Sequence, residues 1–94
     1  MAKSTKEADW YSEVLTLIQE SAKNKRSLEN LFEDLFTPSE RLHLAKRWQI
    51  IKQLNKNTSQ REISADLRVG LATVTRGARE LEDIEGAFYK ILNN

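Results

Sequence analysis

The chain has 94 residues, of which 15 are Lys or Arg and 14 are Asp or Glu, with no cysteine, one proline and three glycines. This length predicts a single domain over residues 1–94, near the size at which one core is only just sufficient, so a partner subunit would add stability. The lack of cysteine excludes a disulfide scaffold, a thiolate metal site and a cysteine nucleophile. No apolar signal core opens the chain and no apolar run has membrane length, so we expect a cytoplasmic protein that has no membrane partner.

The net charge of +1 conceals an uneven distribution along the chain. Between residues 39 and 79 nine basic residues are opposed by three acids, so this segment carries +6 and the flanks together carry −5. A basic middle between acidic flanks favours a surface that binds a polyanion. The alternative is a set of solvated helix faces.

The apolar periodicity is helical throughout and predicts an all-α fold of about six helices. Residues 1–7 have nothing to pack and are predicted to form a disordered arm, ahead of a helix from about residue 8 to 23. A short second helix is predicted to follow Ser27. These two helices carry more apolar side chains than one chain of this size covers, which predicts a homodimer. The side chains concerned are Trp10, Tyr11, Leu15, Ile18, Leu31, Phe32 and Leu35.

The run from Thr37 to Glu40 predicts the start of a third helix, because Thr37 can cap it, Pro38 suits its first position and Glu40 completes a capping box. This helix should run to about Asn55. A polar break at residues 55–58 follows it, and a last apolar segment over 87–92 should pack back onto the body. The apolar stripe predicted for the third helix consists of Leu44, Trp48 and Ile51, with Ala45 and Leu54 beside it.

Residues 59–81 have the layout of a helix-turn-helix: a capped short helix, a tight turn over residues 68–70 and a second helix. Ser64 is the small residue expected where the two helices approach. A left-handed backbone costs a residue with a Cβ roughly 1 kcal/mol or more, and the turn position that often holds glycine is here Arg68. Either Arg68 tolerates this strain or the turn is reshaped. The alternative for the whole segment is a helical hairpin used only for packing. The apolar residues expected to lock the pair are Ile63, Leu67, Val69, Val74 and Leu81.

At ~100° per residue, the second helix of this segment presents two different faces. One face is small, polar or basic and suits contact with base edges and methyl groups. The other offers an arginine for a carboxylate, a glutamate for an ammonium and a glycine for close approach, as a zwitterion site would need. The alternative for Arg76 and Glu80 is a surface i, i+4 ion pair worth ~0.3–0.5 kcal/mol. The first face holds Leu71, Ala72, Thr75 and Arg79, and the second holds Thr73, Arg76, Gly77 and Glu80.

The chain resembles the tryptophan repressor family at Arg47 and in three segments, residues 35–41, 59–62 and 70–77. The resemblance covers about residues 31–82 and depends on the order and spacing of its T-P-x-E-R and A-T-x-T-R-G elements. It implies an intertwined, all-helical homodimer that binds a palindromic operator in double-stranded DNA when L-tryptophan is bound as corepressor.

The resemblance also implies roles for single residues. Arg47 and Arg76 would sandwich the indole, and Arg76 with the Thr37 hydroxyl would hold the carboxylate. Gly70, Thr73 and Gly77 would line the pocket, and backbone carbonyls around Asp34 and Phe36 of the other subunit would face the ammonium. Where the family usually reads Ser-Asn-Ser, this chain has Ala78-Arg79-Glu80. Glu80 would either bind the ammonium with a full charge or tie up Arg76 and close the pocket, and Glu82 stands where a basic residue is expected.

For DNA, Arg61 and Arg79 are expected to specify sequence, and Lys56 and Arg68 to contact phosphates. His43 is expected at the surface or at an interface. The chain shows no phosphate loop, metal cluster or catalytic triad, so we expect neither an enzyme nor a metalloprotein. Two alternatives remain: a repressor of the same fold with another ligand or none, and a helical module that binds a protein. The full set of predicted DNA contacts is Gln60, Arg61, Arg68, Leu71, Ala72, Thr75 and Arg79.

Overall fold

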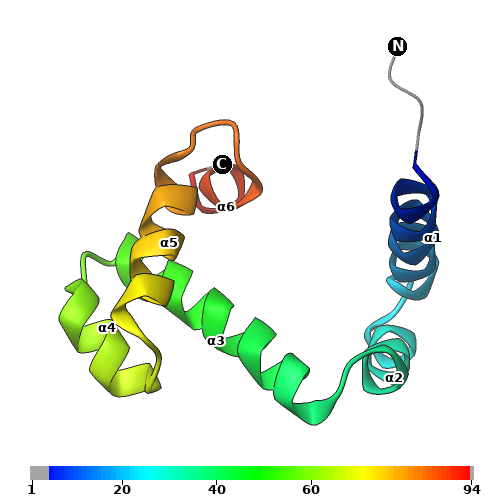
Figure 1. Cartoon of the computed structure of the whole chain (residues 1–94), viewed down its shortest axis with the longest axis horizontal. Coiled ribbons are helices and arrows are strands. Elements are labelled where there is room, and N and C mark those ends of the chain that lie inside the picture. The colour runs from blue at the N-terminus through cyan, green and yellow to red at the C-terminus, as the bar shows by residue number, and fades with distance from the viewer. Residues whose placement is uncertain (1–4, 94) are drawn as a thin grey trace. The chain divides into compact units, whose positions relative to one another are not determined.

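The computed structural model describes residues 5–93, and within this range the chain forms six helices and no strand (Figure 1). The all-α prediction is therefore confirmed. The helices are α1 (Lys6–Ser21), α2 (Lys25–Leu35), α3 (Pro38–Asn55), α4 (Gln60–Leu67), α5 (Leu71–Glu82) and α6 (Ala87–Leu92).

The first helix begins earlier than the sequence pattern indicates. The prediction of a disordered arm over residues 1–7 is wrong for Lys6 and Glu7, which form the first turn of α1. The reason is a local cap, because the Ala8 N–H donates to Thr5 Oγ1 at 3.0 Å. The rest of the predicted arm includes residues 1–4, which lie outside the described residues.

The chain divides into two compact units, one ending at Arg41 and the other beginning at Leu42. In the first unit α1 contacts α2, yet neither helix contains a buried residue. Trp10, Tyr11 and Leu15 are 58%, 66% and 48% exposed. The packing within this unit therefore leaves several of its large apolar side chains exposed. The single domain predicted over residues 1–94 stays a prediction.

Two sets of local hydrogen bonds stabilise the junction between α2 and α3 in the first unit. Thr37 and Glu40 form the predicted capping box: the Thr37 N–H donates to Glu40 Oε1 at 2.9 Å, and the Glu40 N–H donates to Thr37 Oγ1 at 3.2 Å. Arg41 Nη1 donates to the carbonyl oxygens of Phe36 at 2.6 Å and Glu33 at 3.3 Å. The guanidinium thus satisfies carbonyls at the end of α2 that have no helical partner of their own.

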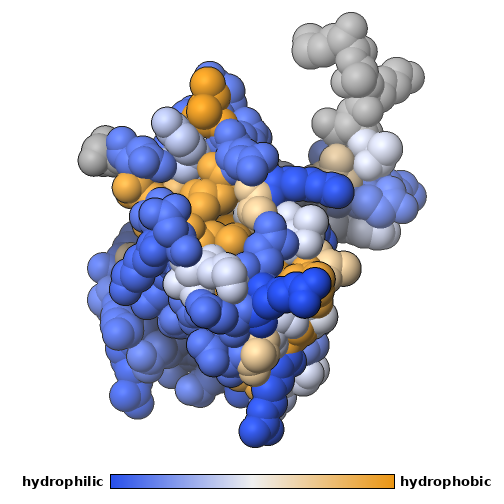
Figure 2. Space-filling model, turned by 90° about the vertical axis from the view of Figure 1, so that its left-hand side faces the viewer, coloured by the Kyte–Doolittle hydropathy of each residue, from blue (hydrophilic) through white to orange (hydrophobic). Residues whose placement is uncertain are grey.

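The second unit contains the core. Its centre is formed by Ile50, Ile63 and Val74, which are at most 2% exposed. The partly buried side chains that pack against this centre are Leu54, Leu67 and Val69. Among residues 5–93 only one further apolar residue, Ile51, is as deeply buried. The molecular surface accordingly shows an open apolar area among hydrophilic side chains on the face in Figure 2.

The apolar stripe predicted for α3 is only partly correct. Ile51 is buried, but Leu44 and Trp48 are 37% and 36% exposed, whereas Ile50, which the stripe leaves out, is in the core. The helix-turn-helix packs on the side of α3 that carries Ile50. Periodicity within α3 alone does not determine that side, because the contact is made with a distant segment of the chain.

The helix-turn-helix geometry predicted over residues 59–81 is present in α4, α5 and the turn between them (Figure 1). Ser59 Oγ accepts from the Glu62 N–H at 3.2 Å and caps α4. Ser64 Oγ donates to the Val69 carbonyl at 2.6 Å and so joins α4 to the turn. Arg68 has φ 54° and ψ 51°, the left-handed conformation. The chain therefore tolerates the strain at Arg68 and the turn is not reshaped.

We predict that Arg68→Gly raises the free energy of unfolding by about 1 kcal/mol, because glycine adopts this backbone without the Cβ penalty. Arg68→Ala removes the same charge but keeps the penalty, so it is the matched control. Urea unfolding followed by circular dichroism measures both variants. Equal free energies of unfolding for the glycine and alanine variants would contradict the claim that the backbone at residue 68 is strained.

Candidate functional site

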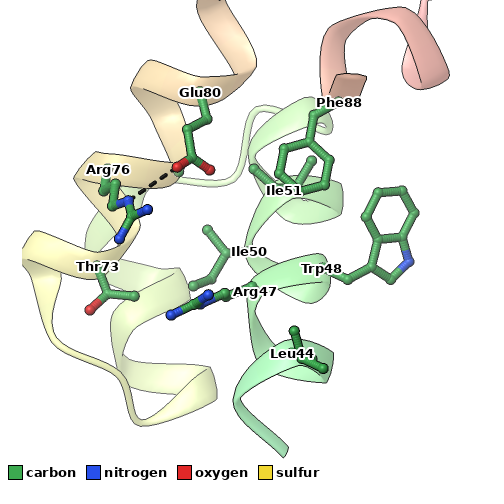
Figure 3. Close-up of a pocket in the computed structure, with 10 residues that line it drawn as sticks. Leu44, Arg47, Trp48, Ile50, Ile51, Thr73, Arg76, Glu80 and Phe88 are labelled. Atoms are coloured by element: carbon green, nitrogen blue, oxygen red, sulfur yellow. Dashed lines mark hydrogen bonds and ion pairs between the residues drawn. The ribbon is translucent and has the colours of Figure 1, made fainter. Parts of the chain in front are cut away.

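An open cavity of about 370 Å³ lies in the second unit and is lined by α3, α5 and α6. Arg47 extends from α3 towards α5, whose Thr73, Arg76 and Glu80 form the opposite wall (Figure 3). Five of the seven residues predicted to bind a ligand therefore meet in one cavity, the fifth being Gly77. The remaining lining is apolar and consists of Leu44, Trp48, Ile50, Ile51 and Phe88.

Gly77 determines how closely α5 approaches α3. The residue is buried, and a Cβ added to it would lie 2.9 Å from Ile50 Cγ2 and 3.6 Å from Ile51 Cδ1. Real Cβ atoms essentially never come within 3.0 Å of another heavy atom, so a side chain here would displace Ile50. The missing side chain lets the backbone of α5 rest on α3, and this contact brings Arg76 and Arg47 to the same cavity.

The cavity contains one ion pair, between Arg76 Nε and Glu80 Oε1 at 3.1 Å (Figure 3). The side chains of Arg76 and Glu80 are 73% and 44% exposed, so solvent screens the pair and its effect on stability is small. The pair leaves the cavity open. No ion pair involves Arg47 within residues 5–93. The cavity thus presents one arginine paired with a carboxylate and one without such a partner.

The apolar wall of the cavity was not predicted as part of a site. The wall residues Leu44 and Ile51 lie three residues before and four after Arg47, so on a helix they share its face, and this spacing is a signal that the sequence contains. Phe88 lies in a different helix from Arg47, so no spacing in the sequence predicts that it lines the cavity. Its ring centroid lies 6.2 Å from that of Trp48, a contact that depends on where the segment between α5 and α6 directs the chain.

The two other predicted ligand residues are not part of the lining of this cavity. Thr37 belongs to the first unit, where its hydroxyl accepts the Glu40 N–H, and a hydroxyl that accepts one bond can still donate another. Gly70 is the N-cap of α5 and lines a neighbouring cavity together with Arg47 and Thr73. The Phe36 carbonyl, predicted to face an ammonium, accepts from Arg41.

Most of the residues predicted to contact DNA are exposed on α4, on α5 and in the turn between them. Thr75 Oγ1 donates to Gln60 Oε1 at 2.8 Å, so the first turn of α4 is joined to the outer face of α5. No ion pair within residues 5–93 neutralises the basic members of the set. The exposed members are Arg61, Arg68, Leu71, Ala72 and Arg79, and the predicted phosphate contact Lys56 is also exposed.

A family model described as Trp repressor protein matches residues 9–94, which is most of the chain. The chain belongs to the Trp repressor family. This membership confirms the resemblance drawn from the motifs. It also identifies the chain as a member of a family of transcriptional repressors.

Relatives named Trp operon repressor homolog come from several Vibrio and Aliivibrio species. The protein of Vibrio vulnificus (strain YJ016) is 39% identical over 83 residues, which cover 87% of this chain and 79% of the relative. That of Aliivibrio fischeri (strain MJ11) is 43% identical over 83 residues, or 87% of this chain and 75% of the relative. That of Vibrio cholerae is 38% identical over 90 residues, or 90% and 85% of the two chains. No solved structure gives a significant match.

Two further properties concern residues 5–93 alone. None of the helices in this range combines the length and the apolar character that crossing a membrane requires. Within the same range no three histidine, aspartate or glutamate side chains gather as a metal site would need.

Proposed function

We propose that the chain is a dimeric, sequence-specific DNA-binding repressor that takes L-tryptophan as its corepressor in the α3–α5–α6 cavity. The observation that carries this proposal is the convergence of two guanidiniums, Arg47 and Arg76, on a cavity with an apolar wall. A planar guanidinium stacks on an aromatic face and also pairs with a carboxylate. An indole with an amino-acid head group needs both kinds of contact in one place.

The position of the cavity links ligand binding to DNA binding. Thr73, Arg76 and Glu80 on one side of α5 line the cavity, while Thr75 and Arg79 belong to the face predicted to contact DNA. A ligand held between α3 and α5 changes where α5 lies relative to α3. In a dimer, two reading helices must reach half-sites about one helical turn of DNA apart, roughly 34–36 Å, so a small displacement of each alters the affinity.

Within this proposal, Arg61 and Arg79 read base edges, assisted by Gln60 and Thr75. The smaller residues Leu71 and Ala72 at the start of α5 make apolar contacts with the thymine methyl group. Lys56 and Arg68 contact phosphates, which position the protein on the duplex and make binding dependent on salt.

Glu80 is the residue that distinguishes this pocket from the pattern typical of the family. Its carboxylate offers a partner for the ammonium of an amino acid, and at the same time it occupies Arg76, which the ligand carboxylate would use. A ligand that carries both charges satisfies Glu80 and Arg76 together. A ligand with a carboxylate and no ammonium leaves Glu80 as a competing anion.

The exposed apolar side chains of α1 and α2 support a homodimer. Neither helix has a buried residue, and large side chains such as Trp10 and Tyr11 are more than half exposed. Burying apolar surface contributes roughly 25 cal/mol per Å², so covering these helices with those of a second chain stabilises the fold. We infer that the two chains intertwine through them.

We predict that L-tryptophan raises the affinity for a palindromic duplex. The duplex is selected from a random-sequence pool in the presence of tryptophan, and its affinity is then measured by fluorescence anisotropy with and without the amino acid. Equal affinities at saturating tryptophan would indicate a repressor with another ligand or none. A chain that binds no duplex at all would favour the protein-binding module.

The Glu80 carboxylate should also set ligand selectivity. We predict that the native chain binds L-tryptophan more tightly than indole-3-propionate, which lacks the ammonium, and that Glu80→Ser reverses or removes this preference. Calorimetric titration of both ligands into both proteins measures it. Glu82→Ser, which removes an acid outside the cavity, is the control that should leave the preference unchanged. An identical preference in the native chain and Glu80→Ser would exclude Glu80 from the pocket.

A sedimentation experiment tests the dimer. We predict a mass of two chains at micromolar concentration and a shift towards one chain in Tyr11→Lys, because the new charge would have to be desolvated in the interface. Ile91→Lys places the same charge at a comparably exposed site on α6 and should leave the mass at two chains. A mass of one chain for the native protein would refute the dimer.

A further inference from the structure

A second cavity in the same unit has a different character from the first. Its volume is about 340 Å³, and it lies where α3 faces the turn of the helix-turn-helix. The cations that line it are Lys46 and Arg47 from α3 and Arg68 from the turn, and the imidazole of His43 lies one turn before Arg47 on α3. No acidic residue lines this cavity.

The charges around this cavity are not neutralised within the described chain. No ion pair in residues 5–93 joins Lys46, Arg47 or Arg68 to a carboxylate. Like charges that share a small space repel one another, and an anion placed between them removes that repulsion. The cavity therefore favours an oxyanion over a neutral or cationic ligand.

The remaining lining suits a phosphate group in particular. Arg68 and Arg47 can donate in a bidentate manner, and a lysine ammonium binds phosphate as a point charge. Gly70 leaves room, since a Cβ added there would meet only Thr73 Oγ1, at 4.0 Å. The Thr73 hydroxyl adds a neutral donor on the same side.

Arg68 lines the cavity from a turn position at which its backbone is strained. Arg68 adopts the left-handed conformation, which costs a residue with a Cβ stability and which glycine would adopt freely. The Ser64 hydroxyl bond to the Val69 carbonyl joins the residue after Arg68 to α4. The turn thus holds a cation on the cavity at a conformational cost.

The position of the cavity indicates which phosphate it meets. Gly70 immediately precedes Leu71 and Ala72, the first residues of the face predicted to read bases. We propose that the cavity formed by Lys46, Arg68 and His43 is a clamp for a backbone phosphate of the operator, with Lys46 and His43 extending the DNA-binding surface from the helix-turn-helix onto α3. This inference rests on the proposed DNA-binding function and adds to it contacts outside the helix-turn-helix.

The test is the dependence of DNA affinity on salt concentration. Each phosphate contact contributes about 0.9 to the slope of log K against log salt concentration, so in a dimer Lys46→Gln should reduce the slope by about 2. The loss should be the same on a selected operator and on a duplex of unrelated sequence, because a phosphate contact carries no sequence information. Lys46→Arg keeps the charge and should retain the native slope.

The matched control is Lys90→Gln on α6. Lys90 lines neither cavity and pairs with Glu85 at 3.4 Å, so its loss should leave the slope within experimental error of the native value. Thermal unfolding of each variant, monitored by circular dichroism, confirms that the folds are intact. Arg68→Gln should reduce the slope as Lys46→Gln does.

The outcomes separate this inference from the proposed function. A native chain that binds DNA with a slope that Lys46→Gln leaves unchanged overturns the clamp and leaves the repressor standing, whatever the effect of Arg68→Gln, because Arg68 is a phosphate contact of the proposed function as well. A native chain that binds no duplex refutes both. If inorganic phosphate alone raises the unfolding temperature of the native chain and not of Lys46→Gln, while DNA affinity is unaffected by the substitution, the cavity binds a free anion and the assignment to the operator is wrong.

Discussion

The contact on which the second unit depends is that of Gly77 with Ile50. A Cβ at residue 77 would come within 2.9 Å of the Ile50 methyl group, so the close approach of α5 to α3 requires glycine. Ile50 in turn packs with Ile63 of α4 and Val74 of α5 in the core. The missing side chain at residue 77 therefore determines how closely α5 approaches α3, and with it the distance across the cavity between Arg47 and Arg76.

The same contact explains why the polar residues on the two sides of α5 have different surroundings. Thr73, Arg76 and Glu80 lie in the first cavity because Gly77, which shares their face, rests on α3. Thr75 lies off that face and bonds to Gln60 of α4, so its position is fixed by the partner helix of the motif. The helix is held on one side by α3 and on another by α4, and the first cavity lies on the side of α3.

Capping motifs and apolar periodicity in the sequence predict those features of the structure that arise from residues close together in the chain. The Thr37–Glu40 capping box and the bounds of the last helix agree with the structure, because a cap involves residues three apart and periodicity extends over one segment. The grouping of Thr73, Arg76, Gly77 and Glu80 follows from helix geometry alone and agrees with the first cavity. The burial of Ile50 in place of Trp48 and the arrival of Phe88 at the cavity are non-local. Both features depend on how separate helices pack against one another, and the apolar periodicity within one helix does not predict that packing.

The two cavities are not independent, because Arg47, Ile50 and Thr73 line both. A ligand that stacks on the Arg47 guanidinium in the first cavity restricts the same side chain where it faces the second. Under the proposed function, binding at the two sites is coupled through this shared residue, and linkage would then require that the effect of the corepressor on DNA affinity equal the effect of DNA on corepressor affinity. Arg47 is therefore the residue at which a substitution should alter the coupling as well as each affinity, whereas Lys46 and Arg76, each confined to one cavity, affect one binding event directly.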